Sequence, residues 1–377
     1  MSDLVIRPVS TRRDRHAFVD FAWVVYKDDP AWVPPLKSEV HALMDAKKNP
    51  WFGHGRAAFF LVERDGEVVG RISAQVDDLV QERMPATGQW GFFDALDGEA
   101  AAALIAHAEE WLRGQGMTNA LGPITISIWD EPGLLIEGFD ESPLAMMGHH
   151  RPEYRAWIEA AGYAKAKDLL TFQLDIRIDM IPVIDRLIQT GSKNPRIRIR
   201  DVDKAKFDQE AAIILDILND AWSDNWGFTP LTDAEIAYAG KKLKPIIVED
   251  LVKIAEVDGE PAAFMITLPD LNEMIADLNG SLVPFGWAKL LWRLRKVTTR
   301  RVRVPLMGVR KVHQHGRLAS QLAFMLIEYT RRVCVDKYGI NIGEFGWVLE
   351  DNQGMMSIAQ LPGAGVNHVY RVYEKAL

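Results

Sequence analysis

The sequence predicts two α/β domains in tandem, each built on a mixed β-sheet. Three observations predict this: the length of the chain, an internal repeat, and the same order of strands and helices in both halves. With 377 residues the chain exceeds a typical single domain, since roughly 150 residues per domain is a working expectation. We place the domains at residues 1–176 and 177–377, joined near "DIRIDMIPVIDRLIQTGSKNP".

The repeat is a pair of similar hairpin sequences. The first, "FFLVERDGEVVGRISAQV", surrounds Asp65, and the second, "VKIAEVDGEPAAFMITL", surrounds Asp258 about half a chain later. Each has an apolar strand, an Asp-Gly turn and a second apolar strand. This pattern predicts two β-hairpins with equivalent positions in the two domains.

The elements around the hairpins also follow one order. Each half begins with a strand and a helix and continues after its hairpin with a short strand and an amphipathic helix. The amphipathic helices lie in "AAALIAHAEEWLRGQG" and from about Leu318 to Lys337, and glycines follow both. Each half then closes with a strand, a short helix and a final strand. The sequence therefore predicts the same mixed-sheet topology twice.

Composition excludes several classes of protein. The chain is 48% hydrophobic and 25% charged, as is typical of soluble globular proteins, and its net charge of -8 gives no electrostatic reason to expect a nucleic-acid partner. The first residues do not form a signal peptide, and no apolar run approaches the ~20 residues that span a membrane. We expect a cytoplasmic protein. The only cysteine, Cys334, excludes an internal disulfide and a cysteine-based zinc cluster, and a buried structural role is favoured over a catalytic thiol.

One stretch, "VRKVHQHGRLASQL", carries the most specific motif. A strand ends at Gly308 and Val309, and "QHGRLA" follows at the start of a helix. Together with the element order, this stretch resembles the GCN5-related N-acetyltransferase (GNAT) superfamily, and the likeness extends over nearly the whole chain as two such domains. In that family (Gln or Arg)-x-x-Gly-x-(Gly or Ala) receives the pyrophosphate of coenzyme A on backbone N–H groups. Gln314 and Ala319 match, whereas Arg317 stands where the family has its middle glycine.

The resemblance implies an acyl-CoA co-substrate, acetyl-CoA or a longer one, bound by the second domain. Its implied binding residues lie on the strand, the loop and the later helix start: Met307, Gly308, Val309, Gln314, His315, Gly316, Arg317, Leu318, Ala319 and Asn352. The backbone of the strand would also donate to the oxyanion. His313 and His315 are either part of this phosphate-holding loop or plain solvent-exposed histidines. A metal site is the least favoured alternative, because no third ligand has suitable spacing, and we expect no metal.

The first half lacks such a loop. Asp94, Asp97 and Glu99 stand where a phosphate would have to sit, and like charges repel it. We therefore expect the N-terminal domain to bind no cofactor and to have a structural or substrate-shaping role.

The catalytic candidates lie near the end of the chain: Glu344, Glu350, Asn352, Tyr370 and Tyr373. The two glutamates are candidate bases or solvated carboxylates, and Asn352 is a cofactor contact or a plain helix N-cap. The resemblance implies a tyrosine as the acid, but Ala359 occupies that position in "NQGMMSIAQLPGA". Tyr370 or Tyr373 is a candidate replacement, since alternation along a strand allows at most one of them, and a structural role is the alternative for each.

A long segment, Gly122–Trp157, is rich in glycine and proline yet apolar and aromatic. It also resembles a segment of an uncharacterised bacterial group of tandem acetyltransferase-like proteins. We expect it either to wall the substrate pocket or to form an Ω-loop packed by its own side chains. The candidate pocket residues are Asp130, Glu131, Met147, His149, His150 and Tyr154.

A basic amphipathic stretch, Phe285–Arg303, stands out in an acidic protein. We expect an insertion that packs on the core with a solvated basic side. Binding to a membrane surface or an anionic partner is the alternative.

The favoured function is acyl-CoA-dependent transfer of an acyl group to the amine of a small molecule. A non-catalytic acyl-CoA-binding or assembly protein is the alternative, favoured by the changed glycine and the missing tyrosine. Hydrolysis of a nucleotide pyrophosphate is disfavoured, because the adjacent Glu109 and Glu110 point to different sides of their helix. The sequence leaves the acceptor, the acyl length and the choice between monomer and homodimer open.

Overall fold

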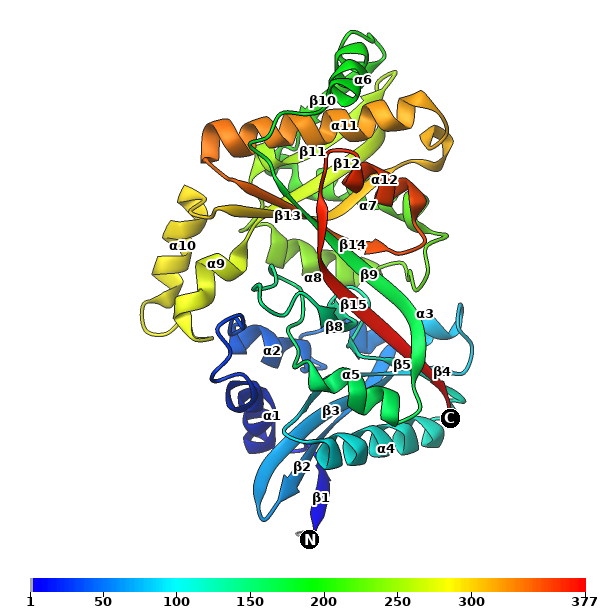
Figure 1. The fold of residues 1–377 in the computed structure, drawn as a ribbon, viewed down its shortest axis with the longest axis vertical. Coiled ribbons are helices and arrows are strands. Elements are labelled where there is room, and N and C mark those ends of the chain that lie inside the picture. The colour runs from blue at the N-terminus through cyan, green and yellow to red at the C-terminus, as the bar shows by residue number, and fades with distance from the viewer. Residues whose placement is uncertain (1–2) are drawn as a thin grey trace. The chain divides into compact units, whose positions relative to one another are not determined.

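A computed structural model describes residues 3–377 of the chain (Figure 1). The chain forms two compact units, and both are mixed α/β structures. Unit 1 comprises Met1–Leu169, Ile275–Trp287 and His368–Leu377; unit 2 comprises Leu170–Met274 and Ala288–Asn367. The sequence placed the final strand of the chain with its second half, whereas the structure groups His368–Leu377 with unit 1.

Unit 1 is built on a mixed sheet with the strand order β1-β2-β3-β4-β5-β15. Neighbouring strands are antiparallel except β4 and β5, which run parallel, and β8 also pairs with β15. The strands are β1 (Leu4–Pro8), β2 (Gly55–Arg64), β3 (Glu67–Asp77), β4 (Thr87–Ala95), β5 (Asn119–Gly122), β8 (Leu134–Glu137) and β15 (Gly365–Ala376), with the short pair β6 (Ile124–Thr125) and β7 (Glu131–Pro132).

The helices α1 and α4 of unit 1 begin at side-chain caps. Thr11 and Asp14 form a reciprocal capping box at the start of α1, and the side chain of Asp97 accepts from the Ala100 N–H at the start of α4. The α4 face that contains Leu104 and Leu112 is fully buried. The helices are α1 (Arg12–Val25), α2 (Lys37–Leu43), η1 (Pro50–Gly53), α3 (Asp78–Gln81), α4 (Gly98–Gly114), α5 (Glu153–Ala160) and η4 (Ala276–Leu278).

Unit 2 repeats this plan with the strand order β9-β14-β13-β12-β11-β10. Strands β10 to β13 are antiparallel neighbours, and β13 and β14 run parallel. The strands are β9 (Ala164–Asp175), β10 (Ile197–Asp201), β11 (Val252–Val257), β12 (Glu260–Pro269), β13 (Arg301–Val309) and β14 (Ile342–Leu349).

The central helix of unit 2 is α11, which packs on β11, β12 and α6. Its buried residues, among them Leu322 and Met325, form one core with Phe345 and with α6 residues such as Ile184. The helices are α6 (Pro182–Ser192), η2 (Lys204–Lys206), α7 (Phe207–Trp222), α8 (Asp233–Leu243), η3 (Glu249–Leu251), α9 (Leu271–Ile275), α10 (Gly286–Lys296), η5 (Lys311–His313), α11 (Arg317–Arg332), η6 (Val333–Lys337) and α12 (Gln353–Gln360).

The two predicted hairpins are confirmed. In the β2–β3 turn Asp65 and Gly66 have φ of 52° and 84°, and in the β11–β12 turn Asp258 and Gly259 have φ of 55° and 88°. Positive φ at both central residues is typical of the two-residue turn that matches the twist of a hairpin. The prediction of a mixed α/β fold repeated in each half is also confirmed.

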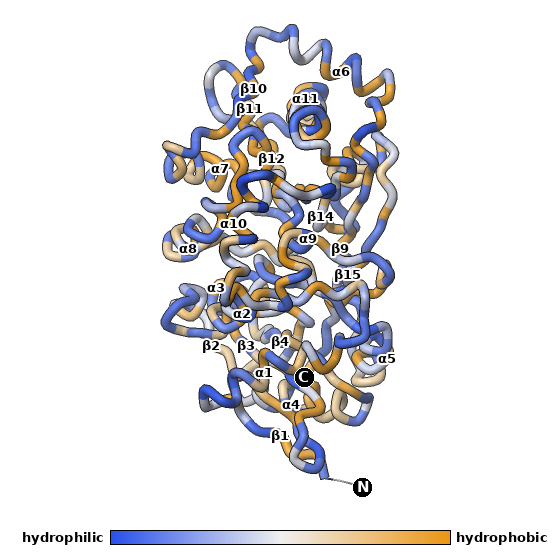
Figure 2. The backbone as a smooth tube through the Cα atoms, turned by 90° about the vertical axis from the view of Figure 1, so that its left-hand side faces the viewer, coloured by the Kyte–Doolittle hydropathy of each residue, from blue (hydrophilic) through white to orange (hydrophobic). Residues whose placement is uncertain are grey.

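Hydrophobic and hydrophilic residues interchange along the backbone (Figure 2). Among residues 3–377, we find no helix with the length and apolar character needed to cross a bilayer. The expectation that the amphipathic stretch packs on the core is wrong for its helical part, because none of the described residues of α10 is buried.

Candidate functional site

The candidate cofactor strand of unit 2 is β13, which continues beyond its pairing with β14. The parallel register covers only Arg301–Val304 and Ile342–Phe345. The antiparallel register with β12 continues to Val309, with a shift in register between Ile266 and Leu268. Pro305 lies at the point where the pairing with β14 ends, and it has no N–H to donate to a neighbouring strand. The backbone of Met307, Gly308 and Val309 therefore lies past the last β14 partner, on a strand that an extended ligand can join.

The loop after β13 leads into a helix start suited to an anion. Gly316, the N-cap of α11, has φ 84° and ψ -162°, a conformation open almost only to glycine. No side chain within residues 3–377 caps this helix, so its first N–H groups and its dipole face outward. Gln314 Nε2 donates to the carbonyl oxygen of Val309 at 2.8 Å and ties the loop to the end of the strand. Leu318 and Ala319 lie in the first turn, half-buried.

The charges around this loop are largely engaged by neighbouring helices. Arg317 Nη2 donates to Thr190 Oγ1 of α6 at 3.2 Å, which holds the guanidinium toward that helix. Arg310 pairs with Asp216, and Lys311 pairs with Asp224, both from the region of α7. His315 is exposed. Across the described part of the chain, no group of three or more His, Cys, Asp or Glu residues is arranged to hold a metal ion.

Glu344 is the buried carboxylate of unit 2. It lies on β14, directly beside Arg303 of β13 in the parallel register, and it is fully buried. Burial raises the pKa of Glu344 to about 7, although Asn367 Nδ2 donates to its Oε2 at 2.6 Å and the charge of Arg303 also favours the carboxylate. A carboxyl group with a pKa near neutrality can both accept and release a proton at physiological pH.

Glu344 lies on the face of the sheet opposite α11. Its strand neighbour Phe345 packs in the α11 core together with Val304, its partner on β13. Because successive side chains of a strand point to opposite faces, Glu344 and Arg303 point the other way. Arg303 is buried, donates to the Gly346 carbonyl oxygen at 3.1 Å and lies over the Trp347 ring. The face opposite α11 therefore carries a buried carboxyl group and a buried guanidinium on neighbouring strands.

The other candidates near the end of unit 2 are closer to the surface. Glu350 is half-buried in the turn after β14. Asn352 Oδ1 accepts from the Met355 N–H at 3.1 Å, so this side chain caps α12.

The two candidate tyrosines belong to unit 1. Tyr370 and Tyr373 lie on β15 and are both buried. The hydroxyl of Tyr370 donates to the Gly148 carbonyl oxygen at 3.0 Å, and that of Tyr373 donates to Glu159 Oε1 at 3.3 Å. Burial raises the pKa of Tyr373 to about 12. The structure thus groups Glu344, Glu350 and Asn352 with the candidate cofactor strand in unit 2, whereas the tyrosines pack within unit 1.

In unit 1 the equivalent strand end is covered by the chain itself. The parallel register of β4 with β5 ends at Gln89, and β6 lies against the residues that follow. A Cβ added to Gly91 would be 2.2 Å from the carbonyl oxygen of Ile124, so the two backbones touch. The Phe92 N–H donates to Thr125 Oγ1 at 3.4 Å. An extended ligand would have to displace β6 to reach this part of β4.

Unit 1 contains a buried polar cluster beside the candidate pocket residues. Arg71 Nε donates to Asp94 Oδ2 at 2.8 Å, and the hydroxyls of Tyr26 and Tyr154 donate to Asp94 Oδ1 at 2.6 Å and 3.2 Å. The sequence analysis singled out Tyr154 but missed the pairing of Arg71 with Asp94. The available signal was a lone arginine inside the apolar strand "EVVGRISAQV".

The remaining pocket candidates lie in the segment from Gly122 to Trp157. Glu131 is exposed at the start of β7. Burial lowers the pKa of His150 to about 3, so His150 is neutral at physiological pH. His150 Nδ1 accepts from the Leu135 N–H at 3.0 Å, and His149 Nε2 lies 2.7 Å from Asp29 Oδ2. Asp130 Oδ2 accepts from Ser127 Oγ, and Met147 is buried. The short strands β6, β7 and β8 lie in the first part of the segment Gly122–Trp157, which contains all of these candidates.

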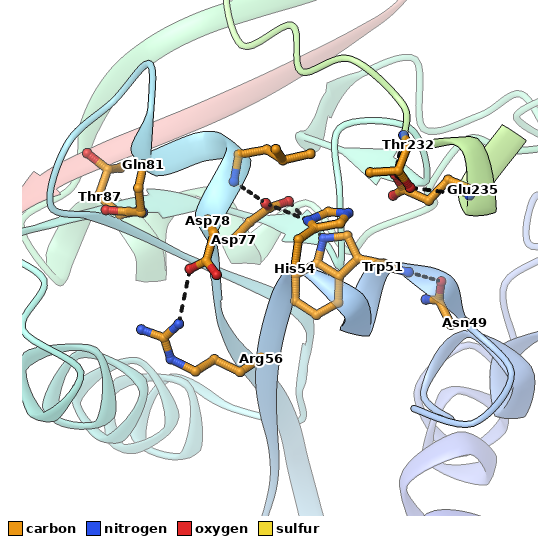
Figure 3. Close-up of polar contacts among 11 residues, drawn as sticks. Asn49, Trp51, His54, Arg56, Asp77, Asp78, Gln81, Thr87, Thr232 and Glu235 are labelled. Carbon is orange, nitrogen blue, oxygen red and sulfur yellow. Dashed lines mark hydrogen bonds and ion pairs between the residues drawn. The ribbon is translucent and has the colours of Figure 1, made fainter.

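A second polar group of unit 1 was not anticipated from the sequence. Trp51 Nε1 donates to Asp77 Oδ2 at 2.8 Å, and His54 Nδ1 lies 3.0 Å from Asp77 Oδ1 (Figure 3). Asp77 is buried at the end of β3 and also caps α3. This carboxylate therefore fixes the orientation of the His54 ring.

Comparison with known structures identifies the fold. The tandem GNAT protein from the clavulanic acid biosynthesis pathway aligns with a TM-score of 0.57 and 15% identity over 99% of this chain and 98% of that one. A GCN5-related N-acetyltransferase from Sphaerobacter thermophilus aligns with a TM-score of 0.54 and 13% identity over 99% and 95%. The protein therefore has the GNAT fold in two tandem domains.

Comparison with known sequences identifies the family. The chain is 42% identical to protein YghO of Escherichia coli (strain K12) over 377 residues, which cover 99% of this chain and 95% of YghO. It is 41% identical to the bacterial ceramide synthase of Caulobacter vibrioides (strain NA1000 / CB15N) over 379 residues, 100% of this chain and 98% of that protein. No family profile matches the chain. The chain belongs to the family of these two proteins.

Proposed function

We propose that the protein is an acyl-CoA-dependent N-acyltransferase whose acceptor is the amine of a long-chain amino alcohol, so that its product is a ceramide. The observation that carries the chemistry is Glu344, a fully buried carboxylate with a pKa near 7 on the strand beside the candidate cofactor strand. The name of the Caulobacter relative supports the acceptor class. A ceramide is the fatty amide of such an amino alcohol, and acyl transfer to an amine makes that bond.

The acyl donor fits residues 177–377, the proposed cofactor domain. The pantetheine arm would lie along the backbone of Met307–Val309, beyond the pairing of β13 with β14, and the pyrophosphate would lie at the helix start after Gly316. Gln314, His315, Arg317, Leu318 and Ala319 would surround it. The thioester supplies an activated acyl group, and a backbone N–H of β13 would stabilise the oxyanion.

The base is Glu344. An aliphatic ammonium has a pKa of about 10, so it must lose a proton before its nitrogen can attack. The Glu344 carboxylate accepts that proton, and the nitrogen attacks the thioester carbonyl carbon and forms the amide bond. The carbon–sulfur bond breaks, and coenzyme A leaves as a thiolate that takes up the second proton released by the nitrogen. The hydrogen bond from Asn367 and, to a smaller extent, the charge of Arg303 favour the ionised form of the buried carboxyl group against burial.

Residues 1–176, the proposed N-terminal domain, would shape the acceptor site without binding a cofactor. Two observations support this: β6 covers the equivalent part of β4, and a buried polar cluster adjoins Glu131, His150 and Tyr154. We propose that Asp130, Glu131, Met147, His149, His150 and Tyr154 contribute to the wall of the acceptor pocket.

A non-catalytic acyl-CoA-binding protein is the second candidate. It is favoured by two departures from the GNAT pattern, Arg317 in place of the middle glycine and Ala359 in place of the tyrosine. This alternative requires thioester binding without turnover.

The test separates binding from turnover. Long-chain and short-chain acyl-CoAs are titrated by calorimetry, and amide formation is followed by mass spectrometry with a long-chain amino alcohol or a short amine as acceptor. Glu344→Gln should bind the donor as the wild type does and lose at least about 10²-fold in kcat. The matched control is Glu328→Gln, a buried carboxylate on α11 held by Arg331 and Arg332, which should keep kcat. Full activity of Glu344→Gln would refute the assigned base, and thioester binding with no product from any amine would favour the non-catalytic alternative.

A further inference from the structure

An exposed apolar segment, Val283–Lys296, precedes β13. It carries five large hydrophobic side chains that are between 42% and 79% exposed: Val283, Phe285, Trp287, Leu291 and Trp292. Within residues 3–377, the exposed large hydrophobics include three aromatic side chains, and all three lie in this segment. Scattered single apolar side chains are ordinary on a protein surface, but a continuous aromatic group in one short segment marks an interaction site.

The helix α10 exposes Trp287, Leu291 and Trp292. Trp287 and Leu291 are four residues apart and share one helical face, with Trp292 farther round the exposed side. Leu290 and Leu294, three and seven residues after Trp287, flank it on the same face and are half-buried. Arg293 Nη1 donates to the Met274 carbonyl oxygen and anchors the helix. This contact holds α10 in place while its large exposed side chains stay in solvent.

The same surface is positively charged. Lys289, Arg295, Lys296 and Arg300 are exposed in and just after α10, and the sequence from Asn279 to Arg303 contains no Asp or Glu. The chain as a whole has a net charge of -8. This local excess of cations complements an anionic surface rather than the acidic remainder of the protein.

We propose that the segment Val283–Lys296 docks the protein on the surface of an anionic lipid bilayer. The aromatic side chains would enter the headgroup region, where tryptophan is favoured because its ring is apolar and its N–H can meet water. The lysines and arginines would contact anionic headgroups. An amphipathic helix that combines tryptophan, leucine and cations lies in the plane of the interface and does not cross the bilayer. A neutral protein partner would explain the apolar face. It would not explain the cations around that face, among which no Asp or Glu occurs between Asn279 and Arg303.

The test is flotation of the full chain with two kinds of vesicle. One kind contains phosphatidylglycerol and phosphatidylethanolamine, and the other only phosphatidylcholine. We expect binding to the anionic vesicles at least about tenfold tighter than to the neutral ones, and weakened by high salt. Phe285→Ser/Trp292→Ser and Arg295→Glu/Lys296→Glu should each weaken it at least about tenfold.

Matched controls separate the segment from general charge and hydrophobicity. Lys47→Glu/Lys48→Glu changes the net charge equally at exposed positions of unit 1, and Val24→Ser/Leu361→Ser removes two exposed apolar side chains elsewhere. Both controls should bind vesicles as the wild type does. No binding to anionic vesicles, equal loss in the controls, or self-association through the segment without lipid binding would overturn the proposal.

The proposed function is measured separately, with the acceptor dispersed in detergent. There the docking variants should keep wild-type turnover, whereas they should lose it when the acceptor is embedded in vesicles. If the docking variants also fail in detergent, the segment serves the reaction directly and the docking proposal is wrong.

Discussion

The substitution Glu344→Gln should stabilise the folded protein above neutral pH. Glu344 is fully buried, and burial raises its pKa from 4.5 to about 7. Below pH 4.5 the carboxyl group is protonated in both the folded and the unfolded chain. Between pH 4.5 and 7 the folded chain binds the extra proton, so the folded state loses stability as the pH rises. Glutamine keeps the size of the protonated acid and never ionises.

The expected size follows from the shift in pKa. One pKa unit corresponds to about 1.4 kcal/mol, and the shift of Glu344 spans between two and three units. Between about pH 5 and pH 8.5 the free energy of unfolding of Glu344→Gln, measured relative to the wild type, should therefore rise by about 2.5 kcal/mol. Asn367 can still donate to the amide oxygen of the glutamine, so the main hydrogen bond persists.

The assay is urea unfolding of the full chain at both pH values, followed by circular dichroism. Glu328→Gln is the control without a pH dependence in this range. Burial raises the pKa of Glu328, but hydrogen bonds from Arg331 and Arg332 outweigh burial and lower it below 4.5 overall. That carboxylate stabilises the fold throughout the range above its unfolded pKa, so the stability cost of Glu328→Gln should be nearly the same at both pH values. A difference between Glu344→Gln and the wild type that is the same at both pH values would refute a near-neutral pKa for Glu344.

Three further predictions concern the two strand ends and the buried polar cluster of unit 1. Gly316→Ala should weaken acyl-CoA binding about tenfold in calorimetry, because alanine costs about 1–3 kcal/mol in that conformation; Gly259→Ala, a positive-φ turn glycine elsewhere in unit 2, should leave the affinity unchanged. Gly91→Ala should lower the melting temperature, because its Cβ would lie 2.2 Å from a carbonyl oxygen of β6, and an unchanged melting temperature would contradict that contact. Arg71→Met should cost about 3–5 kcal/mol in urea unfolding by leaving the Asp94 carboxylate without its buried partner, and Arg71→Met/Asp94→Asn should recover part of the loss.

The hairpins and the amphipathic helices could be predicted because their patterns are local. Asp-Gly between alternating strands fixes a turn, and apolar residues on one side of a helix fix the face that packs on the sheet. Asn352 is a similar case, since its N-cap role depends on residues within one turn. The strand partners of the C-terminal segment could not be predicted from local patterns. The strand β15 pairs with β5 and β8, and such pairing depends on residues far apart in sequence.

The chemical state of the site residues was also beyond the sequence. Glu344 and Glu350 look alike in "GEFGWVLEDN", yet the first is fully buried and the second half-buried, and only burial raises a carboxyl pKa to about 7. The stretch that includes α10 had two interpretations, and the exposure of Trp287 and Trp292 contradicts the core-packing one for that helix. In both cases the pattern of residues predicted the secondary structure but not the depth at which it lies.

The two units differ in what covers the end of the parallel strand pair. Both units end a parallel strand pair at the same place, after Gln89 on β4 and after Val304 on β13. In unit 1 the segment after β5 crosses back as β6 and lies against β4, and Gly91 permits that backbone contact. In unit 2 the equivalent strand, β14, leads into α12 instead. A difference in the segment after one strand therefore accounts for the cover that β4 has.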